Sequence, residues 1–153
     1  MADSSIARLK AQVEIKADVE KYYGFFRNNM HRLVQMFPQN IKSFQIQDGD
    51  EVRAGCLTHW KYDLGTPMTA KIKIEDIDDG DMSITFNVIQ GDVLRIYKSF
   101  KEKFQVLKVH EGAGSVEWTL EFEKANVNAP DPEEYVDFAV KMSKGLDAYL
   151  CKN

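Results

Sequence analysis

Cysteine, proline and long apolar runs are all scarce in this sequence. Among its 153 residues there are only 2 cysteines and 4 prolines. Cys56 and Cys151 provide no disulfide framework, so we expect two free thiols in a reducing compartment, the cytoplasm. No stretch approaches the roughly 18 consecutive apolar residues of a membrane-spanning helix. Charged residues such as Arg8 and Lys10 interrupt the N-terminal region, and we therefore expect no signal peptide.

An excess of positive charge is also missing. The formal net charge is −4 and no basic run is sustained, which argues against nucleic acid as a partner. We likewise expect no membrane partner. Apolar residues make up 44% of the chain, enough for one core at this length, and we expect a single domain over residues 1–153. The oligomeric state stays open between a monomer and a weak dimer.

A long amphipathic helix is expected over residues 132–152. Asp131 can cap it, and Glu134 completes a capping box. Gly145 costs about 1 kcal/mol relative to alanine inside a helix, which indicates a bend or a close contact. A helix of about 20 residues is roughly 30 Å long and needs a large apolar surface beneath it. Its apolar stripe consists of Tyr135, Phe138, Ala139, Met142, Leu146, Tyr149 and Leu150.

The rest of the chain has the signals of strands and two short helices. Alternating apolar and polar residues predict a first strand over residues 5–15. Two short helices follow, one capped by Asp18 and one over residues 30–36 that ends at Phe37-Pro38. Turns rich in Gly, Asp and Pro then separate six further strands. These strands are predicted over residues 41–47, 55–63, 68–77, 82–90, 95–109 and 115–123. This order is typical of an α+β fold with an antiparallel sheet packed on one face.

The strand faces expected to point inward are rich in large side chains with polar tips. Seven strands curved around one helix enclose more space than a flat sheet, and such side chains suit the wall of a ligand cavity. Composition alone nevertheless favours an ordinary packed core. If the interior is hollow, its wall is predicted to contain Thr58, Trp60, Tyr62, Met68, Ala70, Ile84, Phe86, Val88, Phe100, Phe104, Trp118, Leu120, Tyr135, Phe138 and Met142.

Several local strings resemble those of plant major latex proteins. IQGDVL from Ile89 and YKSFK from Tyr97 resemble the region between the fifth and sixth strands of that family. Trp118, EFEK from Glu121 and DFAVK from Asp137 resemble its C-terminal end. The chain is thus similar to the major latex protein-like family of the birch-pollen-allergen superfamily. The resemblance implies the helix-grip fold, in which a seven-stranded antiparallel sheet and two short helices surround a long C-terminal helix and a hydrophobic cavity.

Two departures from that superfamily limit what the resemblance implies. Its pathogenesis-related branch has a glycine-rich loop, whereas residues 48–55 contain two glycines and three acids. A phosphate there would meet negative charge, so nucleotide binding is disfavoured. Norcoclaurine synthase, an alkaloid-forming relative, uses a lysine early in the seventh strand. This chain has Val116-Glu117-Trp118 in that neighbourhood, so the activity does not transfer.

Glu102 is the first candidate for a catalytic residue. It shares its parity with Phe100 and Phe104, so regular alternation directs its carboxylate into the cavity. Loss of water would raise its pKa there and suit it to general acid or base catalysis. The alternative is a bulge after Phe100 that turns Glu102 outward beside Lys101 and Lys103. The high cost of an unpaired buried charge favours this alternative.

Tyr97 and His31 are the other two catalytic candidates. The Tyr97 phenol can orient a carbonyl or hydroxyl group, and His31 lies at the junction of the short helices, facing the expected cavity mouth. The three histidines and two cysteines have no ligand-like spacing. We therefore expect no metal site and no cofactor.

Two functions from different classes fit these features. The first is the binding of a small hydrophobic plant metabolite, such as a terpenoid, sterol, fatty acid or phenolic, which needs only a hollow core. The second is a cofactor-independent cyclase or isomerase that steers a reactive terpenoid (iridoid-type) or alkaloid intermediate. Orientation alone can contribute several kcal/mol to such a reaction, so the absence of a catalytic motif excludes neither function.

Overall fold

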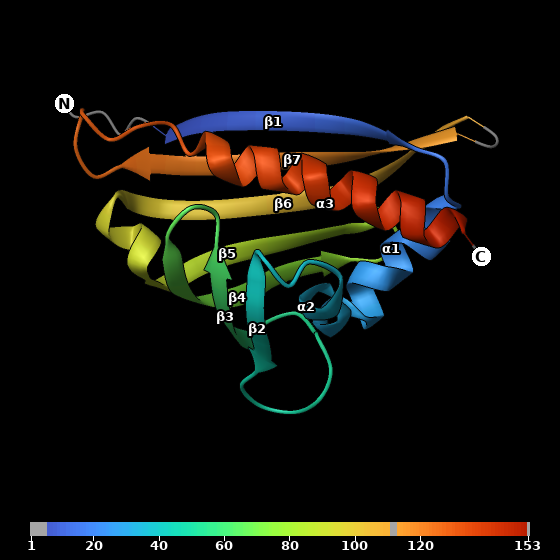
Figure 1. The fold of residues 1–153 in the computed structure, drawn as a ribbon, viewed down its shortest axis with the longest axis horizontal. Helices are drawn as coiled ribbons and strands as arrows, with labels where there is room; N and C mark the ends of the chain where they lie inside the picture. Colours follow the sequence, from blue (N-terminus) through green and yellow to red (C-terminus); the bar gives the residue numbers. More distant parts are fainter. Residues whose placement is uncertain (1–5, 111–112, 153) are drawn as a thin grey trace.

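A single antiparallel sheet curves around one long helix in this protein, for which a computed structural model describes residues 6–110 and 113–152 (Figure 1). The strand order across the sheet is β1-β7-β6-β5-β4-β3-β2. The strands are β1 (Ile6–Ile15), β2 (Ile41–Ile46), β3 (Leu57–Asp63), β4 (Pro67–Asp78), β5 (Ser83–Gly91), β6 (Tyr97–His110) and β7 (Ala113–Lys124).

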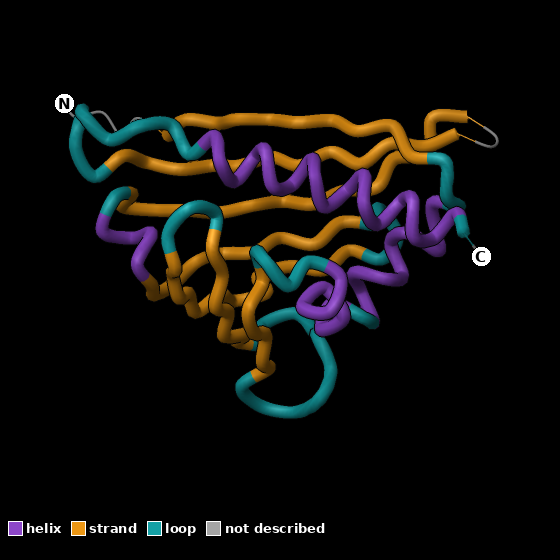
Figure 2. Tube along the Cα trace, in the orientation of Figure 1, coloured by secondary structure: helices purple, strands orange, loops and turns teal. Residues whose placement is uncertain are grey.

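Within the described residues, three helices and two 3₁₀ turns accompany the sheet, and the longest helix lies on its concave side (Figure 2). They are α1 (Val19–Asn28), the 3₁₀ turn η1 (Met30–Arg32), α2 (Leu33–Met36), the 3₁₀ turn η2 (Asp92–Arg95) and α3 (Glu133–Cys151). The long helix α3 runs along β1 and β7, while α1 meets its C-terminal half. The expected fold class and order of elements are confirmed.

The start of β6 differs from the prediction. Residues 92–95 form the turn η2, so β6 begins at Tyr97 instead of residue 95. A register shift between Tyr97 and Ser99 in the pairing with β7 then interrupts the alternation. Tyr97 and Phe100, three residues apart, are consequently both buried. Beyond this bulge the regular alternation is restored.

The predicted capping of α3 by Asp131 is wrong. Pro132 occupies the N-cap position, and no side chain caps the helix there. The Asp131 carboxylate instead lies 3.0 Å from Nζ of Lys124, at the end of β7. Gly145 marks a close contact, since a Cβ at this position would lie 3.0 Å from two ring carbons of Phe37.

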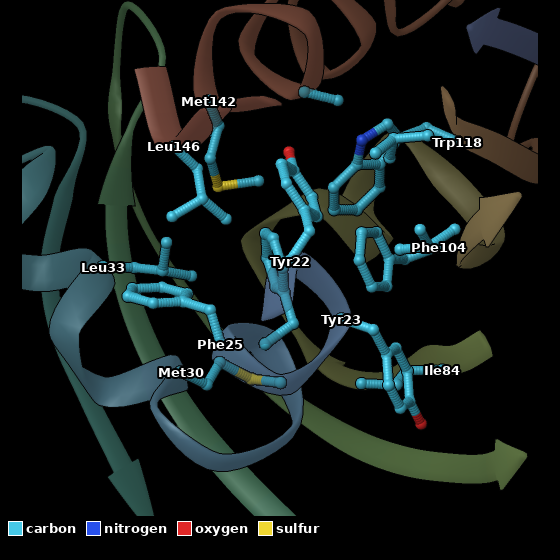
Figure 3. Packing of buried hydrophobic residues seen from close by; sticks show 14 of the residues in the cluster. Tyr22, Tyr23, Phe25, Met30, Leu33, Ile84, Phe104, Trp118, Met142 and Leu146 are labelled. Carbon is cyan, nitrogen blue, oxygen red and sulfur yellow. The ribbon is translucent and has the colours of Figure 1, made fainter. Parts of the chain in front are cut away.

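Ser143 joins three parts of the core through hydrogen bonds. Its hydroxyl accepts a hydrogen bond from Nε1 of Trp118 in β7 at 2.7 Å and donates one to the Ala139 carbonyl. Its backbone carbonyl accepts one from the Tyr22 hydroxyl of α1 at 3.0 Å. Tyr22 thereby lies between Leu146 of α3 and the aromatic side chains of the sheet (Figure 3). Ser143 is fully buried, and both its hydroxyl group and its backbone carbonyl have hydrogen-bond partners.

Asp147 provides a second polar anchor, one turn further along α3. Its carboxylate accepts hydrogen bonds from the backbone N–H groups of Lys16 and Ala17, at 3.0 Å and 2.8 Å. These two residues connect β1 to α1. The C-terminal half of α3 is therefore attached to the sheet and to the first helix at once.

Replacing Asp147 tests the strength of this anchor. We expect Asp147→Ala to lower the free energy of unfolding by about 2 kcal/mol, because two backbone donors lose a charged acceptor. Urea titration followed by circular dichroism measures the change. The matched control is Asp137→Ala, on an exposed position of the same helix, with an expected change within about 0.5 kcal/mol. Equal effects of the two substitutions would contradict the assignment.

Candidate functional site

An internal cavity of about 120 Å³ lies between the sheet and the N-terminal half of α3. It lies where two packed clusters meet, one around Phe104 and Trp118 and the other around Tyr97 and Phe122, because residues of both clusters line it. Its wall is made of Phe26, Met30, Leu33, Ile41, Trp60, Tyr62, Leu64, Ala70, Ile72, Phe86, Val88, Phe100, Glu102, Trp118, Tyr135, Phe138, Ala139 and Met142. The only ionisable groups among these described residues are Glu102, Tyr62 and Tyr135.

The Glu102 carboxyl group belongs to the wall of this cavity. Its neighbours on the same face of β6, Phe100 and Phe104, are buried, while Lys101 and Lys103 point to the outer face of the sheet. Lys101 is paired there with Glu75 at 3.0 Å. The bulge lies before Phe100 and not after it, so the outward orientation favoured above is wrong. Glu102 therefore lies on the inner face of the sheet, in the wall of the cavity.

Glu102 has no hydrogen bond or ion pair with any side chain of the described residues. Its cross-strand neighbours on the two flanking strands are Phe86 and Leu120, which offer no polar atom on their side chains. Removal from water in this apolar environment raises the pKa of Glu102 to about 8. The carboxyl group is therefore mostly protonated, and uncharged, at neutral pH.

Tyr62 of β3 and Tyr135 of α3 form a hydroxyl pair, the tyrosine pair, that also reaches the cavity. Their two oxygens are 2.6 Å apart, and either can be the donor. Burial raises the pKa of both phenols, and the nearby Glu102 carboxylate adds to each shift. The Tyr135 ring also packs on Phe100, with ring centroids 4.8 Å apart.

Comparison with known proteins agrees with this geometry. The Pathogenesis-related protein Bet v 1 family model matches residues 4–153. The chain belongs to the Bet v 1 family. MLP-like protein 34 of Arabidopsis thaliana is 40% identical over 93% of this chain, and MLP-like protein 43 of the same plant is 34% identical over 97%. The chain covers 96% of the second relative but only 46% of the first, so it spans under half the length of some relatives.

A solved relative has the same fold. The crystal structure of ginseng major latex-like protein 151 from Panax ginseng superposes with a TM-score of 0.88 at 29% identity. The superposition covers 94% of this chain and 97% of the ginseng chain. The resemblance to major latex proteins stated from the sequence is thus confirmed, and this Bet v 1 family member has the helix-grip arrangement of sheet and helix.

Most of the side chains predicted for a cavity wall lie in the wall of this cavity. They are Trp60, Tyr62, Ala70, Phe86, Val88, Phe100, Trp118, Tyr135, Phe138 and Met142. Both tryptophans of the chain are among them. The strand alternation and the apolar stripe of α3 supplied these predictions.

Five predicted wall residues lie outside it. Phe104 and Ile84 are fully buried beneath α1, whose Phe26 ring lies 4.3 Å from that of Phe104. Leu120 packs in the cluster around Tyr97. The Thr58 hydroxyl is used inside the sheet, where it donates to the Ile72 carbonyl. Met68 contacts both hydroxyls of the tyrosine pair through its Sδ atom.

Other wall residues were missed by the list of predicted positions. Phe26, Met30 and Leu33 come from the short helices, whose docking site the sequence did not specify. Their apolar spacing was the available signal, as the helical stripe was for Ala139. The sequence contained no comparable signal for Ile41 and Leu64.

Tyr97 and His31 are not part of the cavity wall. The bulge before Phe100 places Tyr97 in a packed cluster, where its hydroxyl donates to the Pro130 carbonyl at 2.6 Å. Burial raises the pKa of this phenol to about 12. His31 is exposed in η1, because its neighbour Met30 takes the inward position. Neither candidate is therefore placed to contact a ligand inside the cavity.

Residues 6–110 and 113–152 contain neither a metal-binding cluster nor a membrane-spanning helix. No group of three His, Cys, Asp or Glu side chains lies close enough together there to hold a metal ion. None of the helices in these ranges is long and apolar enough to cross a membrane.

The raised pKa of Glu102 predicts how stability depends on pH. The folded protein holds this proton up to about pH 8, whereas an unfolded glutamate loses it near pH 4.5. The free energy of unfolding therefore falls as pH rises between these values, by about 4 kcal/mol from this group. Glu102→Gln removes this slope, so its stability relative to the unmodified protein increases from pH 5 to pH 8. Urea titrations across this range measure it, and parallel pH profiles for the two proteins would contradict it.

Proposed function

We propose that this protein binds a small hydrophobic molecule in the cavity between its sheet and α3. The single observation that carries this proposal is an interior space of about 120 Å³ that the chain's own side chains leave unfilled. The side chains that line this space have fewer contacts than they would have in a filled core. A bound molecule would recover the lost contacts. Membership of the Bet v 1 family supports a binding function, since ligand binding is known in that fold family.

The size of the cavity restricts the ligand. A cavity of about 150 Å³ in another protein accommodates one benzene molecule. The cavity here therefore suits a molecule of about one ring, such as a simple phenolic or a small terpenoid. A sterol or a long fatty acid requires α3 and the β3–β4 turn, which carries Leu64, to move apart.

Filling the cavity tests the binding function. We expect Ala139→Leu to weaken binding of one-ring apolar molecules at least tenfold, because the new side chain occupies the space beneath α3. The emission of Trp60 and Trp118, which both line the cavity, reports ligand binding. Ala148→Leu is the matched control, on the exposed side of the same helix. Binding that survives Ala139→Leu unchanged would place the ligand elsewhere and overturn the proposal.

A cofactor-independent isomerase or cyclase is the second candidate, favoured by Glu102. A carboxyl group with a pKa of about 8 can donate and recover a proton near neutral pH, as a general acid requires. The wall would orient a reactive terpenoid or alkaloid intermediate against it.

Glu102→Gln separates the two candidates. If the protein is a catalyst, the substitution lowers the turnover of its substrate by about 100-fold or more, and the affinity changes little. Product ratios from reactive terpenoid and alkaloid intermediates measure turnover, and Trp emission measures affinity. Turnover unaffected by this substitution removes the support for catalysis and leaves the binding function.

A further inference from the structure

The cavity presents two hydrogen-bond donors for which the described residues provide no strong acceptor. The first is the O–H of protonated Glu102, which no polar side chain contacts. The second belongs to the tyrosine pair. One hydroxyl of Tyr62 and Tyr135 donates to the other, and the remaining hydrogen is left with Sδ of Met68, at 3.7 Å or 3.6 Å. A thioether sulfur is a weak acceptor, so this donor remains available.

Both donors come from residues that line the same cavity. Phe100 precedes Glu102 by two residues on the inner face of β6, so their side chains are separated by about 7 Å. The Phe100 ring in turn packs on Tyr135 at 4.8 Å between centroids. The Glu102 carboxylate also contributes to the raised pKa of both phenols.

We propose that these donors bind the carbonyl oxygen of a small apolar aldehyde or ketone whose hydrocarbon part fills the rest of the cavity. This inference rests on the proposed binding function and specifies the polar group of the ligand. A carbonyl oxygen has two lone pairs and no hydrogen, so it can accept from Glu102 and from the tyrosine pair together. Both donors would then be satisfied without burying a charge.

Other polar groups fit less well. An ammonium group would have to lose its water and ionise Glu102 in an apolar cavity, and desolvation of two ions offsets most of their attraction. A carboxylate would place a second acid beside Glu102. A pure hydrocarbon would leave both donors without an acceptor, a costly arrangement in a closed site.

Three probes with one carbon skeleton test this preference, namely acetophenone, ethylbenzene and 1-phenylethylamine. We expect acetophenone to bind at least tenfold more tightly than ethylbenzene at pH 6.5, since it satisfies two donors. Isothermal titration calorimetry measures the three affinities. The carbonyl stretch of bound ¹³C-labelled acetophenone should lie at lower wavenumber than in an alkane solvent, as hydrogen bonding weakens the bond.

Variants assign the preference to the two donors. Glu102→Leu and the double substitution Tyr62→Phe with Tyr135→Phe should each reduce the ratio of acetophenone to ethylbenzene affinity, and each should return the carbonyl stretch part of the way to its alkane value. Glu133→Gln is the matched control, because Glu133 is an exposed carboxylate at the start of α3. It should leave both readouts unchanged.

The pH profile provides a readout that a purely structural role would not change. Glu102 donates only while protonated, so the preference for acetophenone should decrease as pH rises from 7 to 9. Glu102→Gln, whose amide N–H does not titrate, should show a flat profile. The ionisable groups facing Glu102 are Tyr62 from β3 and Tyr135 from α3, while β5 and β7 present Phe86 and Leu120. Lys101 and Lys103 lie on the opposite face of β6.

The outcomes separate the two proposals. If ethylbenzene and acetophenone bind equally, and Ala139→Leu prevents both from binding, the cavity is a binding site but the carbonyl preference is wrong. Tighter binding of 1-phenylethylamine than of acetophenone also overturns the carbonyl preference, because it identifies Glu102 as a partner for a cation. If none of the three probes binds the unmodified protein, the binding function itself fails for one-ring molecules.

Discussion

The attachment of α3 by its C-terminal half determines what the rest of the structure can be. Ser143 links this half to Trp118 of the sheet and to Tyr22 of α1, and Asp147 holds the junction of β1 and α1. These anchors fix the helix over a curved sheet at one end. The other half, from Tyr135 to Met142, then spans a concave surface that its side chains do not fill. The cavity follows from where the helix is attached.

Aromatic side chains limit the extent of this cavity. Phe26 of α1 packs on Phe104 and Trp118, which closes the end beneath the short helices. Tyr97, Phe100 and Phe122 pack together and close the opposite end. The space between the two clusters is small and almost entirely apolar. In such surroundings the loss of hydration strongly raises the pKa of a carboxyl group, and this is why the protonation state of Glu102 matters most at this site.

The charge state of Glu102 connects stability with function. A carboxyl group that burial keeps protonated makes the folded state less stable as pH rises from about 4.5 to about 8. In the proposed binding mode, the same proton forms a hydrogen bond to the ligand. A lysine buried beside Glu102 would stabilise the carboxylate form of Glu102. The O–H donor would then be lost. On β6 both neighbouring lysines point outward instead, and Lys101 pairs with Glu75.

The sequence alone determined the order of the elements, the bounds of most strands and the faces that point inward. Those features depend on local periodicity and on turn residues, which are encoded over a few positions. It placed Trp60, Phe86 and Trp118 correctly for this reason. Only the tertiary structure decided which inward-facing residues line the cavity and which are covered by other side chains. The docking of α1 covered Phe104, and a bulge after Tyr97 removed that phenol from the cavity. The bulge also left Glu102 in register with its apolar neighbours. These outcomes depend on contacts between residues far apart in the chain, and no local pattern specifies them.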